Sequence, residues 1–506
     1  MSILSRFDMI PLAILTVLFG LTLYIWYSGK KQLPYPPGPK RLPIVGNLFS
    51  MPSQEEWVTY RKWSDEFGSD IIHTDVMGSH VIILNSIKAA NDLLDRRSPI
   101  YSDRPPMAAL RDLLNMDFNI TFLPYGPAWR HLRREFHINF LSTEMEVFRP
   151  FEQRAVHRLL RNFLSSPNNF SKHLRHMAGQ IILSVAYGID VRPEGDPYVE
   201  NAENVLHALE IGSAKEATLF DTIPWLLHMP SWFPGARFKR RARKWCRIVD
   251  NALQTTHDKV KGDLDSGTAA PSVAANMLSK LDENSTELDL LAAKGVPGTM
   301  YMAGADTTVT ALETFILAMT LYPEVQRKAQ AEIDSVVGNS RLPDYSDQDA
   351  LPYVQAVLKE VLRWHPVTPL GVSHKVIKSD VYEGHFIPAG SIIIPNVWGM
   401  LHDPNIFTEP DRFYPERWFS PDVPAFPIQA FGFGARQCPG RVFARRSIWA
   451  NIAGILAAFK IVPTEDGPPE KKYLSGLVSY VKPFRCYIRP RSEAAASLVR
   501  DTENEI

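Results

Sequence analysis

The chain has 506 residues, and its 55 lysines and arginines balance its 55 aspartates and glutamates, so the formal net charge is zero. This balance argues against a nucleic acid as the main partner, because phosphate binding needs a basic excess. The cysteines, Cys246, Cys438 and Cys486, lie far apart and outside any C-x-x-C pair, which argues against a disulfide framework and a zinc cluster.

The first predicted element is a transmembrane anchor helix over residues 9–27. This stretch, MIPLAILTVLFGLTLYIWY, carries no charge. As a helix it would be roughly 28 Å long, which matches a hydrocarbon core of about 30 Å. Four lysines or arginines follow between residues 28 and 41 and one precedes it, so we expect residues 1–8 in the lumen and the rest in the cytosol. A cleaved signal peptide is the alternative, although its apolar region is usually shorter.

A stiff linker and one large domain are expected next. Residues 28–42 are rich in proline and glycine, which predicts an extended spacer that holds the body at a set angle to the membrane. No long Ser/Gly linker or repeat interrupts residues 43–490, so this range is predicted to be a single domain. It has helical periodicity and two short β-like runs, HVIIL and SIIIPNV. We therefore expect a mostly α fold with a small β part, followed by a polar tail over residues 491–506.

A long helix is predicted from about Leu288 to Leu321, with the motif AGADTT at its centre. Asp306 and Thr307 are poor choices for packing alone inside such an apolar helix. Thr307 can bond back to the carbonyl of Ala303, and Gly304 permits a local kink that would open a groove for oxygen and water. A helix cap or a solvated threonine is the alternative interpretation of this motif.

A second helix is predicted within LPYVQAVLKEVLRWHP, residues 351–366, which has an apolar stripe. Glu360 and Arg363 are spaced i, i+3 and lie off that stripe. A bare E-x-x-R pair is most often a solvated surface pair. The motif FYPERW, with Arg417, follows some fifty residues later.

The stretch FGFGARQCPGR, residues 431–441, comes directly before another predicted helix. It fails as a dinucleotide-binding loop because Gln437 stands where a third glycine is needed, and no lysine follows as in a phosphate loop. Cys438 would lie just before a helix N-terminus, where free amides and the helix dipole favour the thiolate. Gly434 and Gly440 let the backbone approach a large flat object. A thiolate beside a flat anionic cofactor suits haem ligation, although a lone cysteine in a turn is more often structural.

Together these motifs resemble the cytochrome P450 family of membrane-anchored, eukaryotic microsomal haem-thiolate monooxygenases. The family signature F-x-x-G-x-R-x-C-x-G is matched by Phe431, Gly434, Arg436, Cys438 and Gly440. The resemblance covers the chain from anchor to C-terminal strands and has a fungal character. It implies the cytochrome P450 fold, with haem b (iron protoporphyrin IX) as cofactor and Cys438 as the axial thiolate ligand of the iron.

The resemblance also implies roles for residues outside the cysteine loop. Asp306 and Thr307 match the acid–alcohol pair that delivers protons during oxygen activation. The haem-binding set comprises Phe431, Arg436, Trp129, Arg133 and, as weaker matches, His374 and Arg104. An ordinary loop charge is the alternative for Arg104.

Glu360, Arg363 and Arg417 match a buried charged cluster of the family behind the cysteine loop, with a structural role. Because a buried ion pair is costly unless it is fully hydrogen-bonded, we expect this cluster to be tightly networked. The segment FDTIPWLLHMPSWFPG, residues 220–235, is aromatic and precedes a basic helix. It matches the mobile substrate-access loop and suits a membrane interface, with a buried core connection as the alternative.

No flavin or nicotinamide fingerprint is found in the sequence, so electrons would come from a separate protein. The resemblance implies the NADPH-cytochrome P450 reductase of the endoplasmic reticulum membrane, with cytochrome b5 as a possible second donor. A basic face would dock that acidic partner. Its candidate residues are Arg130, Arg134, Arg441, Arg445 and Arg446.

The substrate pocket would be lined by residues 107–122, 302–307, 367–373 and the stretch SGLVSY. These are mostly apolar with a few hydroxyls, which favours hydroxylation of a small hydrophobic molecule such as a terpenoid, aromatic, fatty or steroid-like compound. Secondary metabolism or detoxification is the expected setting.

Two other functions stay open on the sequence alone. One is a haem-thiolate isomerase or dehydratase that needs no external electrons, and the other is a membrane-tethered haem sensor or carrier. The acid–alcohol pair disfavours both.

Overall fold

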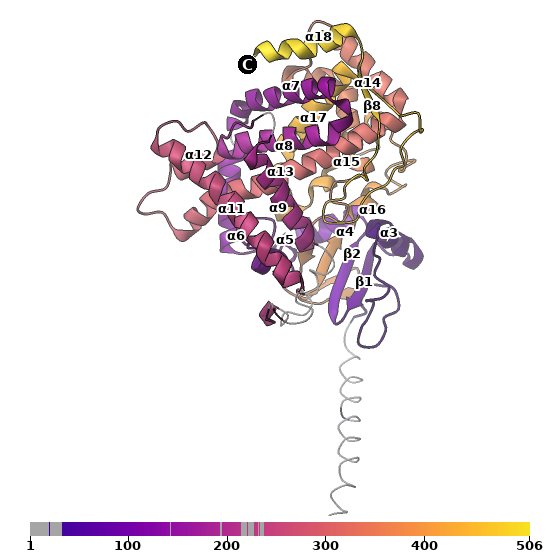
Figure 1. Cartoon of the computed structure of the whole chain (residues 1–506). Helices are drawn as coiled ribbons and strands as arrows, with labels where there is room; N and C mark the ends of the chain where they lie inside the picture. Colours follow the sequence, from indigo (N-terminus) through magenta and orange to yellow (C-terminus); the bar gives the residue numbers. More distant parts are fainter. Residues whose placement is uncertain are drawn as a thin grey trace, which may run out of the picture.

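The computed structural model is a mostly helical body with three small β-sheets (Figure 1), as predicted. The structure describes the following parts of the chain: Gly20, 33–141, 143–192, 195–213, Phe220, 227–230, Trp232 and 237–505.

Two predicted segments fall mainly outside these parts. Except for Gly20, the anchor over residues 9–27 lies outside the described residues, as do residues 1–8. Most of the predicted access loop, residues 220–235, does too. Among the residues that are described, no helix is both long enough and apolar enough to cross a membrane.

The body is built from α-helices that run through most of the chain (Figure 1). Their bounds in chain order are α3 Glu56–Phe67, α4 Ile87–Ala90, α5 Ser98–Tyr101, α6 Pro127–Phe136, α7 Arg149–Ser165, α8 Phe170–Tyr187, α9 Pro197–Ser213, α11 Arg237–Asp265, α12 Val273–Leu278, α13 Glu287–Leu321, α14 Pro323–Val336, α15 Pro352–Trp364, α16 Val397–Leu401, α17 Arg441–Ala458 and α18 Glu493–Asp501.

Short π and 3₁₀ segments connect these helices. They are η2 Asn91–Arg96, η3 Ala109–Leu113, η4 His137–Leu141, η5 Thr143–Phe148, η6 Pro167–Asn169, η8 Tyr345–Ala350, η9 Pro415–Phe419, η10 Ile428–Phe431, η11 Gly434–Arg436 and η12 Thr502–Glu505.

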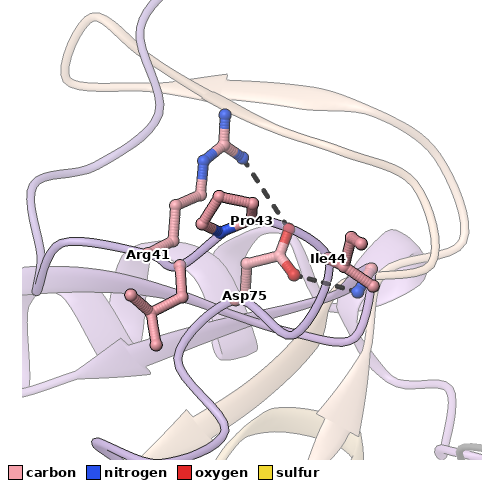
Figure 2. Close-up of a pocket in the computed structure, with 7 residues that line it drawn as sticks. Arg41, Pro43, Ile44 and Asp75 are labelled. Carbon is pink, nitrogen blue, oxygen red and sulfur yellow. Dashed lines mark hydrogen bonds and ion pairs between the residues drawn. The ribbon is translucent and has the colours of Figure 1, made fainter.

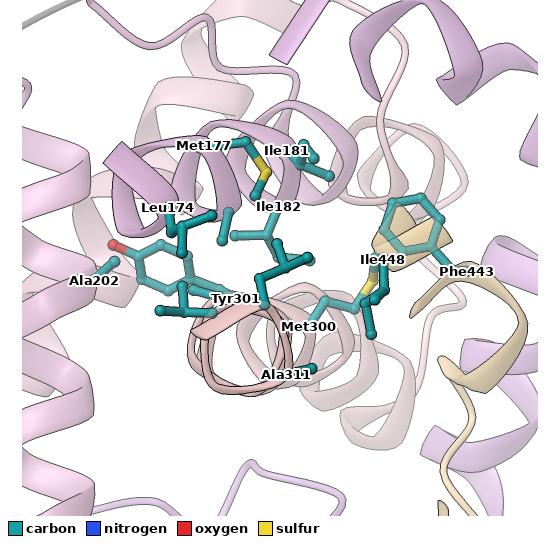
Figure 3. Packing of buried hydrophobic residues seen from close by; sticks show 14 of the residues in the cluster. Leu174, Met177, Ile181, Ile182, Ala202, Met300, Tyr301, Ala311, Phe443 and Ile448 are labelled. Carbon is teal, nitrogen blue, oxygen red and sulfur yellow. The ribbon is translucent and has the colours of Figure 1, made fainter. Parts of the chain in front are cut away.

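Helix α13 is the predicted long helix and runs through the core. It begins at a capping box, in which the Thr286 side chain accepts from the Asp289 N–H and the Asp289 side chain accepts from the Thr286 N–H. It continues without interruption past Pro297 to Leu321. Apolar side chains of α8 and α17 pack against it, as Figure 3 shows around Ile182 and Met300.

The predicted kink at Gly304 is not seen, because α13 is a continuous α-helix from Glu287 to Leu321. The glycine has another use. A Cβ atom added at Gly304 would lie 2.6 Å from Cδ1 of Ile182 on α8. The missing side chain therefore lets α8 and α13 pack closely.

The two predicted β-like runs lie side by side in one sheet of strand order β1-β2-β6-β3. Strand β2 pairs antiparallel with β1 and parallel with β6, with Val81 opposite Ile392. The remaining strands form two separate pairs, β4 with β5 and β7 with β8. The strand bounds are β1 Ile71–Val76, β2 Ser79–Leu84, β3 His374–Lys375, β4 Asp380–Tyr382, β5 His385–Ile387, β6 Ile392–Pro395, β7 Phe459–Val462 and β8 Tyr487–Pro490.

The described part of the predicted linker is packed against this sheet. The Pro37 carbonyl accepts a hydrogen bond from the His73 N–H at 2.9 Å, and the Tyr35 ring stacks on His73 with centroids 4.8 Å apart. Next to it, Asp75 accepts from the Gly78 N–H at 2.9 Å and lies 3.8 Å from Arg41, at the rim of an open surface pocket (Figure 2). The packed part of the chain therefore begins before residue 43.

The predicted polar tail contains α18, which belongs to the body. Ala496 and Val499 of this helix are buried, and α18 packs against α7. Just beyond it, Arg161 donates to Oγ1 of Thr502 at 2.5 Å. Although its composition is polar, this segment therefore forms an amphipathic helix that packs on the body.

Candidate functional site

The cysteine loop is a tight turn between η10 and α17. The Cys438 N–H donates to the Phe431 carbonyl at 2.8 Å, and the Gln437 N–H donates to the Gly434 carbonyl at 3.1 Å. Helix α17 begins at Arg441, as predicted. The Cys438 thiol therefore lies next to the N-terminus of an 18-residue helix.

The two signature glycines serve different purposes. Gly434 has φ of 50°, and a Cβ atom there would lie 2.1 Å from the carbonyl oxygen of Leu94 in η2. This glycine is thus required by the packing of the loop against Leu94. At Gly440 an added Cβ would meet only Sγ of Cys438, at 4.0 Å, so this glycine leaves space beside the thiol.

Opposing effects act on the pKa of Cys438. Burial raises the pKa above the usual thiol value, whereas the Gly440 N–H and the charges of Arg133 and Arg441 lower it. In the protein alone the effect of burial is the largest and the pKa of Cys438 is raised, contrary to the expectation that the helix N-terminus favours the thiolate. A coordinated metal reverses this balance, because a thiol that binds a metal loses its proton.

Arg436 and Trp129 form the wall next to the cysteine loop. Arg436 is buried and donates to the carbonyls of Ser102, Ile120 and Leu123 at 2.8–3.1 Å. Its guanidinium lies over the Trp129 ring, 4.4 Å from the centroid. Burial and the charge of Arg133 lower the pKa of Arg436 to about 9, whereas the charge of Asp103 raises it.

The other predicted cofactor residues also lie in this region. Arg133 donates to the Gln437 carbonyl at 2.5 Å. Arg104 is buried, donates to the carbonyls of Val372 and Ser373 at 2.6 and 2.7 Å, and is close enough to lower the pKa of His374 together with burial. The His374 ring bonds to the Tyr101 carbonyl at 2.8 Å. The structure thus brings the weaker matches, Arg104 and His374, to the same wall as Arg436.

These residues fit a flat group with two carboxylates. In the described part of the chain, no carboxylate lies within 4.0 Å of the guanidinium of Arg104, Arg133 or Arg436. The nearby Asp103 pairs with Lys375 at 3.5 Å instead. The Trp129 indole N–H is buried and lacks a partner. Buried donors without an anion are costly, and the two propionates of haem b would satisfy them.

One face of α13 is open near the centre of the helix, although most residues from Ala292 to Thr320 are buried. Ala303 is exposed and Thr307 is half-buried, and their i, i+4 spacing places them on one face. The Thr307 hydroxyl donates to the Ala303 carbonyl at 2.8 Å, as predicted. This face is where a ligand next to α13 would meet a hydroxyl.

Asp306 lies on another side of the helix and is only 4% exposed. Burial raises its pKa to about 6, while a hydrogen bond from Tyr480 and the charge of Arg175 lower it. The sequence placed Tyr480 in a pocket-lining stretch but did not indicate this contact. The two residues are 174 positions apart, and no local pattern connects them.

The predicted charged cluster is confirmed as a buried network. Both Glu360 and Arg363 are 0% exposed. The Glu360 carboxylate accepts from Arg363 at 2.8 and 3.0 Å, from Arg417 at 3.1 Å and from the Trp418 indole at 2.9 Å. The backbone N–H of Tyr414 adds a further bond at 2.9 Å. Every oxygen of this carboxylate is therefore satisfied, as a buried charge requires.

The predicted basic docking face needs one correction. Arg446 is buried and its guanidinium lies 2.5 Å from the Glu152 carboxylate, so it is not available to a partner. Arg130 and Arg134 of α6 are exposed. Arg441 and Arg445 are half-buried at the start of α17.

Comparisons with known proteins agree with this site. The family model of cytochrome P450 matches residues 36–486. The cytochrome P450 monooxygenase COX2 of Coprinopsis cinerea is 40% identical over 502 residues, which cover 96% of this chain and 95% of that protein. The cytochrome P450 monooxygenase ple1 of Rhodocybe pseudopiperita is 39% identical over 507 residues, which cover 97% of this chain and 96% of that protein.

Proposed function

This chain belongs to the cytochrome P450 family and is a haem-thiolate monooxygenase, and from that premise we propose that it hydroxylates a small hydrophobic substrate with electrons from NADPH-cytochrome P450 reductase. One oxygen atom of O2 enters a C–H bond and the other leaves as water, and two electrons and two protons balance the reaction. The observation that carries the proposal is the set of buried cationic and N–H donors beside Cys438 that lack an anionic partner.

We assign roles to the residues around the cofactor as follows. Cys438 binds the haem iron through its sulfur. Arg104, Arg133, Arg436 and the Trp129 indole bind the propionates, and His374 and Phe431 complete the wall. The haem, when bound, supplies the electron-transfer and oxygen-activation chemistry that no side chain can supply.

Protons would come from α13. Asp306, with a pKa of about 6, can both release and regain a proton near neutral pH. Thr307 offers its hydroxyl on the open face of the helix, where it can orient a water or pass a proton on. This acid and hydroxyl also disfavour the isomerase and sensor alternatives, neither of which needs protons delivered.

The substrate is expected to be a terpenoid, aromatic, fatty or steroid-like compound of secondary metabolism or detoxification. The support is the apolar character of the stretches 107–122, 302–307 and 367–373. The test is a substrate screen with reconstituted reductase and NADPH, with products identified by mass spectrometry. Oxygenated product in proportion to NADPH is expected, and turnover of a peroxide without reductase would contradict the proposal.

We further propose attachment to the endoplasmic reticulum membrane through residues 9–27, with the catalytic domain in the cytosol. The support is the charge-free stretch itself and exposed apolar side chains just after the predicted linker, including Ile44, 93% exposed, and Phe49, 78% exposed. A chain without residues 1–32 is expected to leave the microsomal fraction in high-salt wash. Its retention there would contradict an anchor in this segment.

The ligand role of Cys438 has a direct test. Cys438→Ala is expected to abolish the red-shifted Soret band of the reduced carbon monoxide complex, because that shift requires a thiolate on the iron. The half-buried thiol of Cys246 provides the matched control, since it lies on α11. A Cys246→Ser protein is expected to keep the band, and a Cys438→Ala protein that also keeps it would overturn the assignment.

A further inference from the structure

A buried hydrogen bond connects α13 with the loop of residues 473–481. The Tyr480 hydroxyl donates to Oδ2 of Asp306. Asp306 is 4% exposed and Tyr480 is half-buried. The contact therefore lies inside the protein, next to the proposed proton donor.

The backbone of the loop fixes the position of Tyr480. The Leu474 N–H donates to the Tyr480 carbonyl at 2.8 Å, and the Ser479 N–H donates to the Val367 carbonyl at 2.9 Å. The Ser479 hydroxyl also bonds to the His365 ring at 2.8 Å. Because these hydrogen bonds anchor the loop on both sides of its tip, they fix the position of the Tyr480 hydroxyl next to Asp306.

Asp306 and Thr307 face different directions. Consecutive residues of an α-helix are turned by about 100°. The Thr307 hydroxyl bonds to the Ala303 carbonyl on the open face, whereas the Asp306 carboxylate bonds to Tyr480. To pass a proton toward Thr307, the carboxyl group has to turn away from Tyr480 or act through a water molecule.

Charged groups from several elements face Asp306. Arg175 of α8 lowers its pKa, and Glu210 of α9 and Glu313 of α13 raise it. The pKa of Tyr480 is raised above its usual value by burial and by the Asp306 charge. The phenol therefore stays protonated at neutral pH and can only donate to the carboxylate.

We propose that Tyr480 is a positioning residue that holds the Asp306 carboxylate away from the open face of α13, so that the loop of residues 473–481 controls when the acid can supply a proton. The proposal rests on the proposed function of Asp306 in proton supply. Each proton given up by the carboxyl group is replaced from water, so no further reactant is needed. The loop includes the stretch SGLVSY, which is expected to line the substrate pocket. A bound substrate that contacts this stretch can therefore shift Tyr480 and change its hydrogen bond to Asp306.

The first test measures the acid itself, independently of turnover. Infrared difference spectra of the haem-loaded protein, with Asp306→Asn subtracted, report the protonated carboxyl band of Asp306 as a function of pH. In Tyr480→Phe we expect the midpoint to move up by about one pH unit, because a bond to the charged form is lost. An unchanged midpoint would overturn the proposal.

The matched control is Tyr301→Phe, which also removes a buried tyrosine hydroxyl from the region. Tyr301 lies on α13 and donates to the Tyr198 carbonyl at 2.6 Å, not to Asp306. This variant is expected to leave the midpoint where it is in the unchanged protein. An equal shift in both variants would show a general loosening of α13 and would also overturn the proposal.

The second test is a double-mutant cycle on coupling, the product formed per NADPH consumed. Tyr480→Phe is expected to lower coupling in the unchanged protein and to have no further effect when Asp306→Asn is already present. Equal loss in both backgrounds would show that Tyr480 acts elsewhere. If the protein without substitutions shows no red-shifted Soret band, the proposed function itself fails. This outcome is distinguishable from a failure of the proposal on Tyr480.

Discussion

At the scale of single residues, the proton-supply pair is split between a buried and an open environment. Asp306 is buried and bonded to Tyr480, and Thr307 lies beside the exposed Ala303. Each hydroxyl or carboxyl group of this pair already has one partner within the protein. On the open face of α13, proton transfer would therefore use the hydroxyl of Thr307.

This arrangement predicts the outcome of Thr307→Ala. We expect normal haem binding, because the Thr307 hydroxyl bonds within its own helix. We expect a drop in product per NADPH of about 10- to 100-fold, because a positioned proton-transfer group is lost. The measurement is oxygen uptake, peroxide and product formed together. Thr320→Ala is the control, since Thr320 makes the same bond to its own helix, at 2.8 Å to the Ile316 carbonyl. Coupled turnover in Thr307→Ala would remove the role of this side chain.

At the scale of elements, buried ion pairs connect α15 with the segment around η9. Glu360 lies between the guanidiniums of Arg363 and Arg417, all three almost fully buried. Arg363 and Arg417 also donate to the carbonyls of Leu401 and Thr408 at 3.0 and 2.6 Å. The cluster thus holds the chain that leads into the cysteine loop.

Glu360→Ala is expected to lower the free energy of unfolding by about 3–5 kcal/mol, because two buried guanidiniums lose their counter-charge. Thermal unfolding and haem retention measure this loss. Lys259→Ala, which breaks an exposed pair with Asp263 on α11, is the control and should change little. Equal effects of the two substitutions would show that the buried cluster is dispensable.

The sequence predicted those elements best whose signal is local. The helices around Asp306, Glu360 and after Cys438 follow from apolar periodicity and lie where expected. The contact of Tyr480 and the packing of Gly434 on Leu94 depend on segments far apart in the chain. Periodicity carries no information on such contacts, so the sequence did not indicate them.

The same reason explains the error at Arg446. A basic run at the start of a helix looks like a surface feature, and Arg441 and Arg445 are indeed partly exposed. Arg446 lies one residue further round the helix and meets Glu152 of α7. Only the packing of α7 on α17 decides which of these arginines is buried.

At the scale of the whole molecule, the exposed arginines of α6 are the candidates for docking the reductase. Replacing both Arg130 and Arg134 by Glu is expected to raise the reductase concentration needed for half-maximal turnover by about 10-fold, because an acidic partner would then be repelled. The effect should shrink as salt is added. Haem content measured in parallel confirms that the site is intact.

The control for this change is Arg500→Glu on α18, which lies at the other end of the body from α6 (Figure 1). It alters the net charge in the same direction and should leave the reductase dependence unchanged. A similar rise in this variant would show a response to overall charge and not to a docking face.

The parallel pairing of β2 with β6 also constrains how the protein is made. Strand β2 ends at Leu84, and its neighbour β6 begins at Ile392, so roughly 300 residues separate them. At about 5–20 residues per second a ribosome needs roughly 15–60 s to add that length. During this time the edge of β2 that will pair with β6 stays unpaired, and an unpaired strand edge in a partly synthesised chain favours aggregation.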